Sequence, residues 1–391
     1  MKAADLQVTR FKGLNNVSDP LGIGLAWLTT ANNVDITDTG RIQRRSGFSS
    51  SIAATAVSGA YSTIDHQRAY YVDAGVLKSF AGVTLASGLS GASMHWAEIN
   101  NQVFYANGVD FGIVAGDNTV LPLAWTAPST PTLAAASGSL APGQYSVMCT
   151  YLMADGRETG PGVAATIDIQ EGQALQISDI PQANGMVTRT YIAPANSTAF
   201  QLAYEGFQTT RLWDYSPNSL GLDLATDDFD PIPTGSTVIQ FWRGRLYAAQ
   251  YFPGSDMTAV WHSQPLGFHL FDLATDFLAI HGKVLMMAPT EEALVIGTDK
   301  EIHAYTGDAI RVLATYGVVP GWCWSRDDDD KAVYIWSQRG LCRAMPFANL
   351  TSGHVSVAPG VQAGAAVIAQ GGQKRFVVAL HAGGTAFNQR T

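Results

Sequence analysis

The stretch ALVIGTDKEIHAYTG, residues 293–307, reads as two short strands on either side of a tight turn. Residues 294–296 are apolar, and residues 302–305 are rich in the apolar and aromatic types that strands favour. Between them, Thr298, Asp299 and Lys300 have the polar composition of a turn. The stretch therefore predicts a β-hairpin, and its pattern recurs along the chain.

Five further segments share this strand–turn–strand pattern: RAYYVDAGVLKSF (68–80), NQVFYANGVDFGIV (101–114), RGRLYAAQ (243–250), KAVYIWSQRGLCRAM (331–345) and KRFVVALHAGGTAF (374–387). We take one strand residue from each of the six segments as an anchor: Tyr71, Phe104, Tyr247, Val295, Tyr334 and Val377. Successive anchors are 33, 143, 48, 39 and 43 residues apart. Four of these spacings lie near the roughly 40–50 residues of a four-stranded propeller blade. The predicted fold is all-β, a β-propeller of about six blades, with residues 8–11 completing the last blade. Unrelated hairpins in two packed sheets are the alternative.

The long spacing of 143 residues indicates an insertion, and the composition changes over residues 127–206. A Pro/Ser/Ala-rich entry leads to a strand whose alternate positions are apolar, and Asp155-Gly156 then marks a hairpin turn. Four further strands are expected at 164–169, 174–178, 187–193 and 200–204. We predict a small β-sandwich of the fibronectin or immunoglobulin type at 127–206, with the propeller divided into residues 1–126 and 207–391. An Asp/Pro-rich loop around 213–235 accounts for the remaining length.

The composition limits the possible partners. The net charge is −9, and this argues against a protein that coats nucleic acid. Charged residues make up only 14% and hydrophobic residues 47% of the chain, so a free monomer would expose large apolar patches. Burial between like subunits would cover them, and head-to-tail contacts that close give a ring. A hexameric ring is therefore expected, with twelve subunits as the alternative. No apolar run suggests a secretion signal or a membrane span.

Candidate catalytic and metal-binding motifs are weak. Asp38-Thr39-Gly40 is close to the Asp-box of sialidase-like propellers, but Ile36 stands where Ser or Thr is required. The four consecutive aspartates at 327–330 lack the spacers and glycine of a calcium loop, and a solvated hairpin tip is the better interpretation. Eight scattered histidines and three distant cysteines form no zinc motif. We therefore expect no catalytic residue, no metal, no cofactor and no enzymatic activity.

The stretch NNVDITDTGRIQRRSGF, residues 32–48, gathers three arginines, Arg41, Arg44 and Arg45, behind a turn with Asp35, Asp38 and Gly40. Arg44 and Arg45 are expected on opposite faces of a strand. A guanidinium group can bind a carboxylate with two parallel hydrogen bonds. Contact with another subunit or a neighbouring protein is the preferred role of the three arginines. Ion pairs within the chain and contacts with DNA phosphates are the alternatives.

Several segments together resemble structural proteins of bacteriophage tails. NNVDITDTGRIQRRSGF resembles their N-terminal signature, and FWRGRLYAAQ (241–250), AVWHSQPLGFHLFD (259–272) and ALVIGTDKEIHAYTGD (293–308) resemble their blades. TYLMADGRETGPG (150–162) is similar to a strand–turn–strand of a sandwich inserted into many of them. The family implied is the tail-hub or nozzle type, whose members form rings around the DNA exit channel.

The resemblance implies a virion protein, made in the host cytoplasm, that serves DNA ejection. Its partners would be copies of itself, other tail proteins on the adaptor or portal side and on the fibre or spike side, and genomic DNA that passes the lumen without specific binding. A carbohydrate- or receptor-binding propeller is one rival interpretation, and a glycan hydrolase with paired carboxylates is another.

Overall fold

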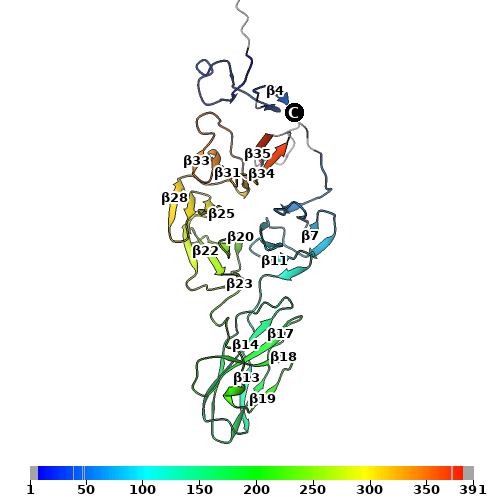
Figure 1. Cartoon of the computed structure of the whole chain (residues 1–391), viewed down its shortest axis with the longest axis vertical. Helices are drawn as coiled ribbons and strands as arrows, with labels where there is room; N and C mark the ends of the chain where they lie inside the picture. Colours follow the sequence, from blue (N-terminus) through cyan, green and yellow to red (C-terminus); the bar gives the residue numbers. More distant parts are fainter. Residues whose placement is uncertain (1–7, 38, 46, 48, 371–372, 382–391) are drawn as a thin grey trace, which may run out of the picture.

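The computed structural model describes residues 8–37, 39–45, 47, 49–370 and 373–381. Within these residues the chain is all-β, with many small antiparallel sheets and one short 3₁₀ helix, η1 (Pro217–Ser219). Figure 1 shows an elongated molecule with three parts in a row: an N-terminal arm, a central body, and an insert at the far end from the arm. No helix in the described part of the chain is long and apolar enough to cross a membrane.

The body contains six strand groups. Five of them are antiparallel sheets, and each of these five is built from its own continuous stretch of chain. In chain order these five are β5 (Val57–Ser62), β6 (Ala69–Asp73), β7 (Val76–Ser79) and β8 (Thr84–Ser87); β9 (His95–Ile99), β10 (Gln102–Ala106), β11 (Phe111–Val114) and β12 (Val120–Pro122); β20 (Ser236–Trp242), β21 (Arg245–Phe252), β22 (Met257–Gln264), β23 (Gly267–Phe271) and β24 (Phe277–His281); β25 (Val284–Pro289), β26 (Leu294–Thr298), β27 (Ile302–Tyr305) and β28 (Ile310–Ala314); and β30 (Trp324–Arg326), β31 (Val333–Ser337), β32 (Gly340–Arg343) and β33 (Ala348–Asn349). The sixth group pairs β29 (Gly321–Trp322) in parallel with β34 (Gln362–Gln370), which forms a hairpin with β35 (Gln373–His381).

The hairpin predicted at 293–307 is confirmed, because β26 and β27 pair across a turn at residues 299–301. Local turn geometry sets several other hairpins. Both residues of the turns Ala74-Gly75, Asn100-Asn101 and Arg243-Gly244 have positive φ. Such turns match the twist of paired strands and therefore bring the flanking segments into register.

The hydrophobic core of the body lies between successive strand groups rather than inside any one of them. One cluster joins the first two groups through Val72, Leu77 and Trp96, and the next joins the second and third through Phe104 and Phe241. Similar clusters join the third to the fourth group and the fourth to the fifth and sixth. The six anchors predicted from sequence lie in six different groups, on β6, β10, β21, β26, β31 and β35.

The groups also share a central cavity of about 590 Å³. All six groups contribute residues to its lining, from β5, β9, β20, β25, β29, β30 and β34. Neighbouring lining strands pack together, with β9 against β20 and β20 against β25. All six groups therefore border one shared cavity.

The insert has two sheets and its own core. The strands are β13 (Thr132–Ser137), β14 (Gly143–Leu152), β15 (Ala165–Ile169), β16 (Gln173–Ser178), β17 (Val187–Ala193), β18 (Gln201–Gly206) and β19 (Arg211–Trp213). They form the sheets β13-β16-β19 and β15-β14-β17-β18, with Tyr145, Ile177 and Trp213 buried between them. β13 lies in the Pro/Ser/Ala-rich entry, where no strand was predicted, and β19 extends this unit beyond residue 206. Residues 214–235 contain η1 and no strand, in agreement with the predicted loop.

The insert is fixed to the body by polar and apolar contacts. The indole Nε1 of Trp125 donates a hydrogen bond to the carbonyl of His269 (2.9 Å), and His269 Nε2 in turn lies 2.9 Å from the carbonyl oxygen of Glu158 in the insert. Trp125, Met153 and Leu270 pack together at the same place. Burial lowers the pKa of His269 to about 4, so its ring is neutral at pH 7 and Nε2 carries the proton that this bond requires.

The arm consists of residues 8–56 and contains two small sheets. β1 (Gly13–Leu14) pairs in parallel with β2 (Trp27–Leu28), and β3 (Val34–Ile36) pairs with β4 (Ile42–Arg44). The prediction that residues 8–11 complete the last blade is wrong. These residues form no strand, because the backbone amide of Phe11 bonds to Gly40 (2.8 Å) and holds the segment within the arm.

Candidate assembly site

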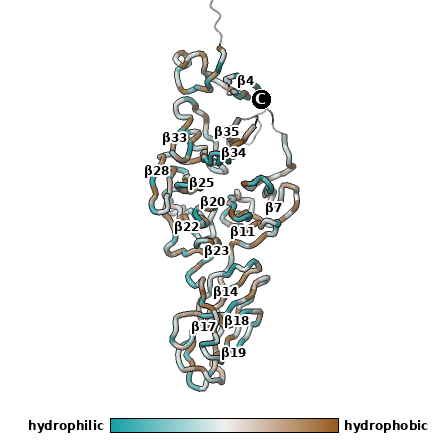
Figure 2. Tube along the Cα trace, viewed as in Figure 1, coloured by the Kyte–Doolittle hydropathy of each residue, from teal (hydrophilic) through white to brown (hydrophobic). Residues whose placement is uncertain are grey.

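The described residues of the arm form no hydrophobic core. Among its described residues only Asn15 and Gly40 are buried, and the first buried hydrophobic side chain of the described chain is Tyr70. Leu21 is 95% exposed, and Val17 and Leu25 are also exposed. In Figure 2 apolar segments in brown alternate with polar ones through the arm as they do through the body. The arm therefore offers apolar surface that the described residues leave uncovered.

Hydrogen bonds in turns hold the arm's shape. The side-chain oxygen Oδ1 of Asn15 accepts from the backbone amides of Val17 and Ser18 (3.3 and 3.1 Å). Gly40 has a φ of +78°, and a Cβ atom there would lie 2.1 Å from the Cγ atom of Arg10. The glycine of the predicted turn is therefore required both by its backbone conformation and by the close approach of residues 10–11. Asp38, the other predicted turn residue, lies outside the described residues.

The three predicted arginines lie on or beside β4 and have different surroundings. Arg44 is opposite Val34 in the hairpin, and Arg41 precedes the strand; both are exposed. Neither side chain has a hydrogen bond or ion pair in the described part of the chain. Arg45 follows the strand, and its Nε lies 3.2 Å from Oδ1 of Asp35. Of the roles considered, Arg45 makes an ion pair within the chain, while Arg41 and Arg44 face solvent.

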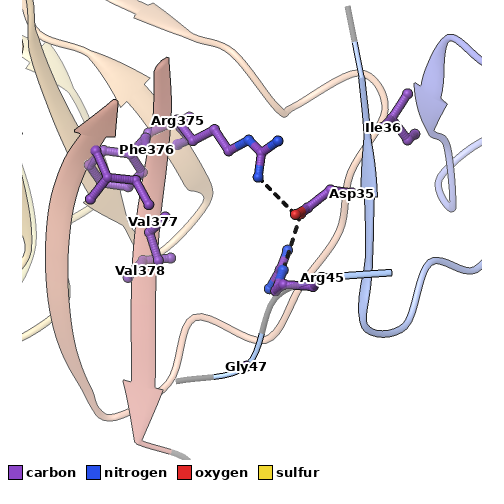
Figure 3. A pocket seen from close by; sticks show the side chains of 10 residues that line it. Asp35, Ile36, Arg45, Gly47, Arg375, Phe376, Val377 and Val378 are labelled. Atoms are coloured by element: carbon purple, nitrogen blue, oxygen red, sulfur yellow. Dashed lines mark hydrogen bonds and ion pairs between the residues drawn. The ribbon is translucent and has the colours of Figure 1, made fainter. Parts of the chain in front are cut away.

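Asp35 also connects the arm to the C-terminal hairpin of the body. Nη1 of Arg375, on β35, lies 2.8 Å from Oδ2 of Asp35, so the carboxylate lies between two guanidinium groups (Figure 3). A cavity of about 600 Å³ adjoins this contact, between Asp35, Ile36 and Arg45 of the arm and residues 375–378 of β35. We call the Asp35–Arg375 contact and its partner Arg45 the arm latch.

A second set of contacts fixes the arm to the loop after β33. The side chain of Asn16 donates to the carbonyl of Ser356 and accepts from its amide, both at 2.8 Å. The rings of Trp27 and His354 stack with centroids 5.1 Å apart. The arm is thus joined to the body by a few polar contacts and one ring pair, which is a small interface for a segment of this length.

The aspartate run at 327–330 differs from its prediction as a solvated tip. Asp328, Asp329 and Asp330 are exposed, but Asp327 is buried and accepts from Lys374 Nζ at 2.7 Å. Lys374 also pairs with Asp329 at 2.6 Å. The hydrogen bond from Lys374 holds the pKa of Asp327 below its usual range. The interpretation was wrong for Asp327 because its partner lies 47 residues away on β35. In the described part of the chain, no three His, Cys, Asp or Glu side chains are grouped so as to hold a metal ion.

Sequence reasoning found Arg45 and Asp35 but not their connection to Arg375. Asp35 and Arg375 are 340 positions apart, and Arg375 lies in a segment (374–387) that was predicted only as a strand–turn–strand unit. No local pattern marks such a pair. Asn16 and His354 were missed for the same reason.

Comparison with known protein families finds no match, and none is found among curated proteins. Among solved structures, the chain is similar to U3-55K with 10% identity and a TM-score of 0.23, over 72% of this chain and 88% of that one. It is also similar to dipeptidyl peptidase 4 of Porphyromonas gingivalis with 9% identity and a TM-score of 0.26, over 78% of this chain and 44% of that one. Similarities at this level carry no argument about function.

Proposed function

We propose that this chain is a structural protein of a bacteriophage tail, of the nozzle or hub type, that forms a ring around the DNA exit channel. The observation that carries the proposal is the arm, whose described residues include no buried hydrophobic side chain. Fixing the backbone of each residue costs about 1–2 kcal/mol of conformational entropy. A coreless segment recovers that cost when a partner covers its apolar side chains, as a neighbouring subunit would.

The arrangement of the body is consistent with this assembly. We propose that the six strand groups are the blades of a six-bladed propeller around the central cavity. Support comes from the contribution of all six groups to that cavity and from the core clusters between successive groups. A body built of such groups would form the wall of a ring, and the arm would reach the next subunit.

The two ends of the molecule would serve different neighbours. The arm and the insert lie at opposite ends of the body (Figure 1). One end would therefore face the adaptor or portal side of the tail and the other the fibre or spike side. The net charge of −9 per chain favours a lumen that DNA passes without sticking, because like charges repel. This role needs no catalysis and no cofactor.

Arg41 and Arg44 are the charged residues of the arm that we assign to subunit or neighbour contacts. Their side chains are exposed and extend from a hairpin that is itself fixed by the latch. An arginine at an interface can pair with a carboxylate of the adjoining chain. Because the body carries excess negative charge, such partners are available on a second copy of this chain.

Sedimentation velocity of the purified chain tests the proposal. Six chains of 41.6 kDa give an assembly of about 250 kDa. The double variant Arg41→Glu/Arg44→Glu should require at least about tenfold higher concentration to assemble, since reversing a charge places like charges together. Arg311→Glu, at an exposed arginine on β28, is the matched control and should assemble normally. A wild-type chain that remains a monomer, or a double variant that assembles as the wild type does, would contradict the proposal.

A further inference from the structure

The central cavity has a wall of aromatic rings. Tyr61 of β5 and Trp96 of β9 stack with centroids 6.0 Å apart, and Trp322 and Trp324 stack at 5.5 Å. Tyr61 also meets Trp322 edge to face at 6.0 Å, which connects the two pairs. The rings come from β5, β9 and the neighbouring strands β29 and β30, and Tyr61, Trp322 and Trp324 remain half-exposed. A ligand in the cavity would therefore meet flat apolar faces on adjacent sides.

Polar groups with unused hydrogen-bonding capacity stand among these rings. Oε2 of Glu98 accepts from the hydroxyl of Tyr61 (3.1 Å) and from the amide of Ile64 (2.8 Å), whereas Oε1 has no partner in the described chain. Arg326 lines the same cavity, and its guanidinium group makes no hydrogen bond or ion pair with any described residue. A fixed acceptor and an unpaired donor thus adjoin one aromatic wall.

Hydrogen bonds hold Glu98 in place, whereas only the strand face of Arg326 is set by the fold. Glu98 is held at the wall by the hydrogen bonds from Tyr61 and Ile64. Burial, together with the negative charge of Glu98, raises the pKa of Tyr61, so the tyrosine hydroxyl stays protonated and donates to Glu98. Arg326 follows Trp324 by two residues on β30, so both side chains lie on the same face of the strand. His66 and Asp328, 3.4 Å apart and both exposed, mark the mouth.

We propose that the central cavity binds a neutral saccharide. A sugar presents C–H groups that pack on aromatic faces, and its hydroxyls both donate and accept hydrogen bonds. Neighbouring hydroxyls can therefore satisfy Glu98, which only accepts, and Arg326, which only donates. The cavity volume falls in the usual range for small-ligand sites, and aromatic walls with a few fixed polar groups are typical of them.

The charges that line the cavity disfavour other ligands. Glu98 and Asp328 balance Arg243 and Arg326, so neither an anion nor a cation is attracted as a whole. A purely apolar ligand would bury the carboxylate and the guanidinium without partners, which is costly. A zwitterionic peptide could satisfy both charges, but its backbone offers no flat C–H face for the Trp322–Trp324 pair.

Binding to an array of neutral oligosaccharides built from hexoses, deoxyhexoses and N-acetylhexosamines tests the inference. Any sugar retained on the array is then titrated against the tryptophan fluorescence of the full chain, with the tripeptide Gly-Gly-Gly measured in parallel. We expect at least one oligosaccharide to bind and to change the fluorescence. Absence of binding to every sugar, or binding of the peptide alone, would overturn the inference.

Variants locate the site. Arg326→Gln should weaken sugar binding by at least about tenfold, the size of one lost charge-assisted contact, and should leave the fold intact because the side chain has no partner to lose. Trp324→Ala should weaken it similarly. Trp27→Ala is the matched control, since Trp27 is also half-buried against one ring but lies in the arm. Unchanged binding in Arg326→Gln and Trp324→Ala would place the sugar elsewhere and refute the site. The ring proposal is measured by sedimentation and does not depend on this result.

Discussion

Replacing Asp35 by alanine should release the arm's hairpin from the body. The contact with Arg375 joins side chains that are 13% and 25% exposed at 2.8 Å, and a hydrogen bond to a charged group at such a site contributes about 1.5–3 kcal/mol. The contact with Arg45 involves a side chain that is 54% exposed and contributes less than about 1 kcal/mol. The docking free energy should therefore fall by about 2–3 kcal/mol, which corresponds to roughly 30- to 140-fold more opening.

Hydrogen exchange measured by mass spectrometry gives the readout. Peptides covering residues 33–47 include the amide of Arg45, which bonds to the carbonyl of Asn33 at 3.0 Å, and they should exchange faster by that factor. Asp19→Ala is the matched control, because Asp19 lies in the arm and, among the described residues, its carboxylate accepts only from the amide of Leu21 nearby. Equal exchange of residues 33–47 in the Asp35 variant and the wild type would refute the latch.

Further predictions concern stability and thiol chemistry. Asp327→Asn should cost about 1 kcal/mol at pH 7, discounted because Lys374 is 40% exposed, while Asp330→Asn should change the melting temperature little. The folded state lowers the pKa of Asp327, so the ionised carboxylate stabilises the protein at pH values above the unfolded pKa near 4. This contribution is lost as the pH falls through the folded pKa. The melting temperatures of the wild type and of Asp327→Asn should therefore become equal in acid. Trp213→Ala should destabilise the insert by about 3–5 kcal/mol in calorimetry, whereas Leu212→Ala, on the exposed face of the same strand, should have little effect. Burial raises the pKa of Cys149 to about 11 and that of Cys323 to about 12, and it also raises the pKa of Cys342. A disulfide reagent at pH 8 should therefore react with none of the three thiols in the native protein and with all three after denaturation.

Hairpins were the part of the fold that sequence could predict. The strands at 187–193 and 294–305 match closely, because apolar alternation and turn residues are local signals. β13 was missed since alanine and serine in TLAAAS give little strand signal, and it is defined by its pairing with β16. The parallel pairing of β29 with β34 was also missed, because it joins segments about 40 residues apart.

The candidate site was predictable only in its exposed half. The arginine-rich stretch after Gly40 can be recognised from the local sequence alone. Arg41 and Arg44 are exposed, as a role in contacts with another chain requires. The latch and the Asp327–Lys374 pair depend on which distant strands become neighbours, and charge patterns do not encode that choice.

Electron microscopy of the purified full-length chain tests the central proposal most directly. The account predicts ring-shaped particles with six subunits around an open centre, with the arm of each subunit against its neighbour and Arg41 and Arg44 at that contact rather than on the lumen wall. A uniform population of single elongated molecules, with the arm exposed, would contradict it, as would a ring whose lumen is lined by these arginines.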